Sequence, residues 1–284
     1  MSVLITVAEL VEALSSDDAP LVLDVRWSLA VPDGSPAYAA EHLPGAIYVD
    51  LNTDLAAPPS ASEGRHPLPT QGSFERAARG WGLTEGETVV VYDDASGLAA
   101  ARAWWLLRHA GVSNVRILDG GLGAWREKRA PLESGEIHPI ASEIELSWGH
   151  MRVIDADVAA ELPDGGLLLD ARAGERYRGE SEPIDPRAGH IPGAVSAPTQ
   201  GNLGDDGLFL AADALRSRFA ALGVDGSRPV AVYCGSGVTA AHEIAALSDA
   251  GIEAALYPGS WSQWSNDEER RVATGAEPDD GKLH

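Results

Sequence analysis

The 284-residue sequence has a single cysteine, no long apolar run, and far fewer basic than acidic residues, 21 against 43. One cysteine excludes an internal disulfide, which fits a reducing compartment. No apolar stretch approaches the roughly 18 residues that span a bilayer, and the N-terminus lacks the basic region of a signal peptide. We therefore expect a cytoplasmic protein. The net charge of −22 argues against partners that need a positive protein surface, so we expect no nucleic-acid and no membrane binding.

Four segments of the sequence occur twice, in the same order and at nearly constant spacing. LVLDVR (21–26) returns as LLLDAR (167–172), EHLPGAIYV (41–49) as GHIPGAVSA (189–197), VVVYDDASGLAAARAWW (89–105) as VAVYCGSGVTAAHEIAA (230–246), and ILDGGLGAW (117–125) as ALYPGSWSQW (255–264). An ordered repeat of this kind indicates a duplicated domain. We predict a first domain over residues 1–132, a linker over 133–150 and a second domain over 151–284.

Each repeat alternates short apolar runs with segments of helical periodicity, which is typical of an α/β fold with a mainly parallel sheet flanked by helices. The predicted strands lie near residues 21–25, 88–92, 115–118, 167–171, 230–233 and 254–257. The predicted helices lie near residues 7–14, 74–81, 98–109, 155–161, 211–222 and 238–250. One further strand is expected in the linker, near residues 142–146.

The only cysteine, Cys234, ends an apolar run and opens the loop Cys-Gly-Ser-Gly, directly before a predicted helix. The glycines permit a sharp turn, so that loop N–H groups and the positive end of the helix can point at the sulfur. This placement favours the thiolate, the nucleophilic form of cysteine. The alternative is an inert packing cysteine. Cys234 lies at the end of the run, where open α/β sheets bind their ligands, and this favours a reactive nucleophile.

The first repeat has Asp93 at the position of Cys234, and an aspartate cannot act as the same soft nucleophile. We therefore expect the first domain to be catalytically silent and to complete the cleft. His42 and His190 precede Pro-Gly turns in both repeats, so they are expected to belong to the scaffold. A phosphatase of the cysteine-dependent class would need an arginine to clamp phosphate at position 240, where this chain has alanine.

The two H-[IL]-P-G-A elements, the D-[AV]-R strand ends, the YPGSWSQW segment and the CGSGVTA loop resemble the tandem-domain rhodanese family of sulfurtransferases over nearly the whole chain. The loop is similar to that of the 3-mercaptopyruvate branch, since thiosulfate sulfurtransferases of the family typically carry basic residues after the cysteine. The resemblance implies two tandem rhodanese-like domains, the second one catalytic.

The activity implied by the resemblance is sulfur transfer through a persulfide on Cys234, without cofactor or metal. The donor would be a small anion, 3-mercaptopyruvate, with thiosulfate as the alternative. The acceptor would be cyanide, a thiol or thioredoxin. A non-catalytic rhodanese-like binding module is a further alternative, which the presence of Cys234 and its glycines disfavours.

The resemblance also assigns roles to residues near Cys234. Ser236 and His66, in RHPLP, would handle protons, although His66 could equally be an ordinary loop histidine. Where the family has an aspartate in this set, the chain has Asn52, flanked by Asp50 and Asp54. The remaining substrate contacts would come from the loop, at Gly235, Gly237, Val238 and Thr239.

Two arginines, Arg176 and Arg187, would bind the donor's carboxylate, because a planar guanidinium pairs bidentately with a carboxylate. The segment between them is about two residues longer than the family pattern, so Arg178 is an alternative to Arg176. Surface arginines without a ligand role are the other alternative.

Overall fold

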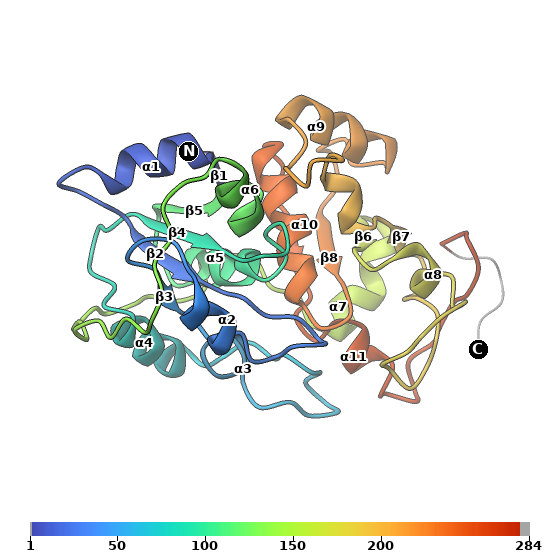
Figure 1. Ribbon diagram of the computed structural model, residues 1–284. Coiled ribbons are helices and arrows are strands. Elements are labelled where there is room, and N and C mark those ends of the chain that lie inside the picture. The colour runs from blue at the N-terminus through green and yellow to red at the C-terminus, as the bar shows by residue number, and fades with distance from the viewer. Residues whose placement is uncertain (1, 279–284) are drawn as a thin grey trace. The chain divides into compact units, whose positions relative to one another are not determined.

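The computed structural model describes residues 2–278, and the chain divides into two compact units (Figure 1). Unit 1 comprises Met1–Ala57, Leu68–Met151 and Asp205–Leu208, and unit 2 comprises Pro58–Pro67, Arg152–Gly204 and Phe209–His284. The short segment Pro58–Pro67 therefore belongs to unit 2, although it lies within the first repeat of the sequence. The domain boundaries given above stay a prediction.

Unit 1 contains a five-stranded sheet in the order β1-β5-β4-β2-β3, with every neighbouring pair parallel. Its strands are β1 (Leu4–Ile5), β2 (Leu21–Asp24), β3 (Ile47–Tyr48), β4 (Val89–Tyr92) and β5 (Val115–Leu118). Its helices are α1 (Val7–Leu14), α2 (Ser35–Ala40), α3 (Leu51–Asp54), α4 (Gln71–Gly80), α5 (Ala100–His109) and α6 (Gly121–Glu127).

Unit 2 contains a four-stranded parallel sheet in the order β7-β6-β8-β9. Its strands are β6 (Leu167–Asp170), β7 (Val195–Ser196), β8 (Val230–Tyr233) and β9 (Ala255–Leu256). Its helices are α7 (Ala156–Glu161), α8 (Gly174–Tyr177), α9 (Ala212–Ala221), α10 (Val238–Asp249) and α11 (Ser260–Trp264), with 3-10 turns η1 (Leu162–Asp164) and η2 (Thr199–Asn202). In unit 1 the edge strand β1 pairs with β5. At the matching place in unit 2, Val153 forms an isolated parallel bridge with Leu256 of β9.

The central strands β4 and β8 are buried along their whole length, and this explains why both read as continuous apolar runs. Each pairs in the same register with the strand before it: Asp24 lies beside Tyr92, and Asp170 beside Tyr233. The next residue along the central strand is Asp93 in unit 1 and Cys234 in unit 2. The α/β class with parallel sheets flanked by helices is thus confirmed in both units.

The scaffold behind each strand end repeats as well. His42 and His190 are fully buried, and each shares a hydrogen bond between its Nδ1 and the carbonyl oxygen of the tyrosine on which it stacks, Tyr38 and Tyr177. These contacts lie within the turn regions of the two units and agree with a structural role for both histidines.

The prediction of a strand near residues 142–146 is wrong. This segment is irregular and lies along α4, where the Ser142 N–H donates to the Arg79 carbonyl oxygen and the Arg79 Nε donates to the Ile144 carbonyl oxygen. Arg79, at the end of α4, thus provides hydrogen-bond partners for the backbone of this segment. The alternation of apolar and polar residues at 142–146 therefore does not require pairing in a sheet. Other short elements were not predicted, because so few residues show no clear periodicity: the strands β1, β3 and β7 and the helices α2, α3, α6, α8 and α11.

Candidate active site

Cys234 follows β8 directly and lies in a closed loop before α10. Its side chain is buried, with the residue only 2% exposed, and its Sγ accepts a hydrogen bond from the Gly237 N–H at 3.2 Å. Gly237 has a φ of +78°, and a Cβ there would lie 2.7 Å from the Pro258 carbonyl oxygen. Glycine is therefore required at this position for both its conformation and its close packing.

The segment from Pro258 to Ser262 holds this loop in place. The Trp261 N–H donates to the Cys234 carbonyl oxygen and the Ser262 N–H donates to the Gly235 carbonyl oxygen, both at 2.9 Å. The Cys234 N–H in turn donates to the Ser260 hydroxyl at 3.2 Å. The backbone of the cysteine loop is thus fixed by the residues at the start of α11, and within the loop the Gly237 N–H is directed at the sulfur.

The matching loop of unit 1 shows what such a loop binds. The Asp93 carboxylate accepts four backbone N–H groups at 2.7–2.9 Å, from Ala95, Gly97, Ala99 and Ala100. Burial raises the pKa of Asp93, and these four donors oppose that shift. A strand-loop-helix turn of this kind is therefore an anion-binding nest, which in unit 1 is filled by the protein's own carboxylate.

Ser236 and His66, which the family resemblance placed in one set, lie in hydrogen-bond contact in unit 2. The distance from His66 Nδ1 to Ser236 Oγ is 2.8 Å, and both residues are buried. His66 is carried by the segment Pro58–Pro67, which is attached to α11: the Arg65 N–H donates to the Ser262 hydroxyl and the Gln263 amide donates to the Ser62 carbonyl oxygen. The buried hydroxyl and imidazole thus form a pair able to pass a proton at the cysteine loop.

Two guanidinium groups lie against Gly235, the residue after the cysteine. A Cβ at Gly235 would be 3.0 Å from Arg65 Nη2 and 3.3 Å from Arg176 Nη1. Arg176, at the third position of α8, was expected near the loop, whereas Arg65 was not singled out. The only sequence signal for Arg65 is its place directly before His66.

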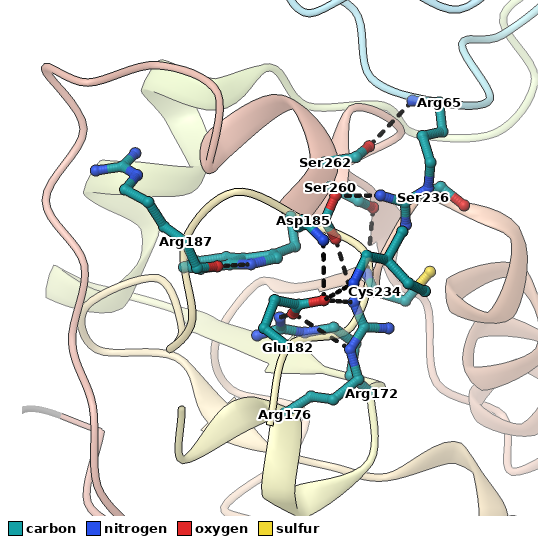
Figure 2. A network of polar contacts seen from close by, with 12 residues as sticks. Arg65, Arg172, Arg176, Glu182, Asp185, Arg187, Cys234, Ser236, Ser260 and Ser262 are labelled. Atoms are coloured by element: carbon teal, nitrogen blue, oxygen red, sulfur yellow. Dashed lines mark hydrogen bonds and ion pairs between the residues drawn. The ribbon is translucent and has the colours of Figure 1, made fainter. Parts of the chain in front are cut away.

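A network of acidic side chains pairs with these arginines (Figure 2). Asp185 forms ion pairs with both Arg65 and Arg176, and Glu182 pairs with Arg176 at 2.7 Å. Burial raises the pKa of Asp185, and the neighbouring Arg65 opposes that shift. Behind them Arg172 is fully buried, pairs with Asp170 at 2.6 Å and lies over the Trp261 ring.

The two other candidate arginines do not contact the loop. The Arg187 guanidinium donates to four backbone carbonyl oxygens, those of Trp264, Ser265, Asp267 and Arg270. It thereby caps the C-terminal end of α11, and Figure 2 shows it pointing away from Cys234. A ligand role for Arg187 stays a prediction that none of these contacts supports. Arg178 forms an ion pair with Glu180 at the surface.

The remaining predicted residues divide between the two units. Val238 and Thr239 are the first two residues of α10 in unit 2, directly after Gly237. Asn52 lies in unit 1, at the second position of α3, where its N–H donates to the Asp50 carboxylate. Asp50 serves as the cap of α3, and burial raises the pKa of Asp54 at the other end of that helix. Asn52 thus has a local helix-capping environment within its own unit.

Comparison with known proteins places these features in a family. The model of the rhodanese-like domain matches residues 6–128 and 155–267. The chain is 46% identical over 278 residues to "Putative thiosulfate sulfurtransferase SseB" of Mycobacterium tuberculosis, covering 96% of this chain and 97% of the relative. It is 47% identical over 281 residues to "Probable 3-mercaptopyruvate sulfurtransferase" of Pseudomonas aeruginosa, covering 96% and 98%.

Among solved structures, SseA from Escherichia coli, described as a 3-mercaptopyruvate sulfotransferase with the rhodanese fold, matches with a TM-score of 0.80 and 30% identity. That match covers 92% of this chain and 99% of the other. Two repeated parallel α/β units, one with a cysteine in its strand-end loop, together with these relatives define a sulfurtransferase. The chain belongs to the rhodanese family. Within residues 2–278, no helix has the length and apolar character to cross a membrane.

Proposed function

We propose that this protein transfers a sulfane sulfur from 3-mercaptopyruvate to a thiophilic acceptor through a persulfide on Cys234. The observation that carries the proposal is the arrangement at one loop: a buried cysteine whose sulfur accepts a backbone N–H, a Ser236–His66 pair and two guanidinium groups against Gly235. Each part matches a requirement of the reaction, namely a nucleophile, a proton carrier and a site for a carboxylate.

In the first half-reaction, the Cys234 thiolate attacks the sulfur of 3-mercaptopyruvate. A sulfur–sulfur bond forms, the carbon–sulfur bond breaks, and the electron pair leaves on carbon as the enolate of pyruvate. The enolate takes up a proton to give pyruvate, and Ser236 with His66 is the proton carrier at this loop. The loop N–H groups and the N-terminus of α10 stabilise the negative charge on the outer sulfur of the persulfide.

In the second half-reaction, an acceptor attacks the outer sulfur. The sulfur–sulfur bond breaks and its electron pair returns to Cys234 as thiolate. Cyanide leaves as thiocyanate, and a small thiol or the thiol of thioredoxin leaves as a persulfide. Because the enzyme alternates between thiolate and persulfide, the two substrates should show double-displacement kinetics.

The names of the relatives do not decide the donor. Two relatives with nearly equal sequence identity to this chain are named for different donors. A carboxylate-bearing donor is favoured by the two arginines at Gly235 and by a loop without basic residues between Gly235 and Ala241. Thiosulfate, with the same persulfide intermediate, is the second candidate, and the name of the mycobacterial relative favours it.

The first test compares initial rates of thiocyanate formation with the two donors and cyanide as the common acceptor. We expect 3-mercaptopyruvate to exceed thiosulfate in kcat/KM, and Cys234 to gain the mass of one sulfur atom when donor is added without acceptor. Cys234→Ser is the matched control and should show neither. A higher kcat/KM with thiosulfate would show that thiosulfate, and not 3-mercaptopyruvate, is the preferred donor. If wild-type Cys234 did not gain the mass of one sulfur atom, the proposed persulfide intermediate would be wrong.

A further inference from the structure

The two arginines at Gly235 come from separate parts of unit 2 and meet at one point. Arg65 belongs to the segment Pro58–Pro67, and Arg176 belongs to α8. Since Gly235 has no side chain, both guanidinium groups contact the loop itself, at 3.0 and 3.3 Å from the place of a Cβ. The positive charge therefore lies beside the backbone that carries Cys234.

One carboxylate joins the two arginines. Asp185 Oδ1 pairs with Arg65 Nη1, and Asp185 Oδ2 pairs with Arg176 Nη2 at 3.1 Å (Figure 2). The Asp185 side chain is only 2% exposed. A single carboxylate held by two guanidinium groups over the nucleophile loop has the geometry that the carboxylate of a 2-oxo acid would need.

The carboxylates of the network differ in how firmly they are held. Asp170 pairs with the fully buried Arg172 through both oxygens, and Glu182 contacts both Arg172 and Arg176. Among the described residues, the Asp185 side chain pairs only with Arg65 and Arg176, the two groups nearest the loop. Loss of Asp185 would leave Arg176 paired with Glu182 but would leave Arg65 without a carboxylate.

Arg65 also has spare capacity to donate hydrogen bonds. Its Nε is buried and has no hydrogen-bond partner among the described residues. A buried guanidinium N–H without an acceptor costs free energy, so a ligand oxygen that reached it would be favoured. The unpaired Arg65 Nε–H therefore favours a ligand at Arg65, independently of the ion pairs.

We propose that Arg65 binds the donor's carboxylate together with Arg176, and that Asp185 is an internal competitor which that carboxylate must displace. The inference rests on the proposed function, because it assumes a donor that carries a carboxylate. It assigns the second ligand to Arg65 in place of Arg187, whose guanidinium is occupied by four carbonyl oxygens. Asp185 then sets the affinity of the site for 2-oxo acids.

The test titrates pyruvate, which has the carboxylate but no transferable sulfur, into the full-length protein by calorimetry. Asp185→Asn should bind pyruvate about tenfold more tightly than wild type, and Arg65→Gln about tenfold more weakly, as expected for a charge-assisted contact. The same changes at the exposed pair Asp213 and Arg216, Asp213→Asn and Arg216→Gln, should leave the pyruvate affinity unchanged.

Three results would overturn the inference: no measurable binding of pyruvate to wild type, an Arg65→Gln affinity equal to wild type, or an Asp185→Asn affinity no tighter than wild type. If Arg65→Gln does not fold, Arg65→Lys keeps the charge, removes the planar fork and should still weaken pyruvate binding. Turnover of the two donors by wild type tests the proposed function separately. If the enzyme prefers thiosulfate but its affinity for pyruvate still changes with Arg65→Gln and Asp185→Asn, the proposed donor is wrong. The carboxylate-binding site at Arg65 is then still supported.

Discussion

At the scale of single residues, the charge on Asp185 should make donor binding depend on pH. The groups that face Asp185 are Arg65, Arg176 and Glu182, and burial raises the pKa of Asp185 above that of an ordinary aspartate. Protonated Asp185 no longer holds the arginines, while pyruvate remains ionised. Pyruvate should therefore bind more tightly as the pH falls from neutral toward the raised pKa of Asp185.

Calorimetric titrations from pH 7.5 to pH 5 check this expectation, with Asp185→Asn as the control. That variant should bind pyruvate tightly at both ends of the range, with no gain toward acid. The two proteins differ only at residue 185, so the difference between their pH profiles reports Asp185. An equal pH dependence in the two proteins would assign the effect to another group.

At the scale of elements, the segment Pro58–Pro67 is held close to α11 by a glycine. Gly64 has a φ of +89°, and a Cβ there would lie 2.7 Å from both the Gly259 carbonyl oxygen and the Ser262 hydroxyl. Gly64→Ala should push this segment outward, and with it Arg65 and His66. We expect kcat/KM to fall by at least about tenfold, since a displacement of about 1 Å at a positioned group can cost 10²-fold.

Gly86→Ala is the matched control for Gly64→Ala. Gly86 has a similar φ of +77°, but a Cβ there meets nothing within 4 Å. Gly86→Ala should lose about 1 kcal/mol of stability from the left-handed backbone conformation, and Gly64→Ala should lose at least as much, measured by thermal unfolding. Only Gly64→Ala should lose sulfur transfer, and an equal loss in both would attribute the effect to backbone strain.

The sequence predicted the elements that carry a clear period or a local signal. The run that ends at Cys234, the glycines after it and the helix from Val238 are consecutive residues, so one stretch of sequence describes the whole loop. The pairing of His66 with Ser236 came from the family resemblance, since no local pattern links residues so far apart.

The roles of the arginines could not be read in the same way. Arg187 was expected at the substrate, but its partners are carbonyl oxygens near the end of α11, and no side-chain pattern marks a backbone carbonyl as an acceptor. Arg65 and Asp185 pair although they are 120 positions apart in the sequence, so no local sequence pattern predicts this ion pair. Charged side chains find partners through the tertiary fold, and their positions in sequence say little about which partner wins.

At the scale of the whole molecule, the two repeats differ in the residue at the matching strand end. Asp93 occupies it in unit 1 and is followed by Asp94, whereas Cys234 is followed by Gly235 with two arginines against it. Asp93→Cys should therefore not create a second sulfur-loading site, because the residue that follows it, Asp94, is negatively charged, whereas in unit 2 two guanidinium groups lie against Gly235.

Intact-mass measurement after 3-mercaptopyruvate treatment checks this expectation. Asp93→Cys should gain one sulfur atom, as wild type does, and the double variant with Cys234→Ser should gain none. A gain of two sulfur atoms by Asp93→Cys would show that the nest and a cysteine are sufficient for loading, and that the surrounding arginines are dispensable.

The allocation of Pro58–Pro67 to unit 2 has an evolutionary consequence. The first repeat has Asp93 where the second has Cys234, yet it contains Arg65 and His66, which lie at the cysteine loop of unit 2. A gene truncated to the second repeat would encode the cysteine without these two side chains. Selection on sulfur transfer would therefore preserve the first repeat although it carries no cysteine, which makes the duplication difficult to reverse.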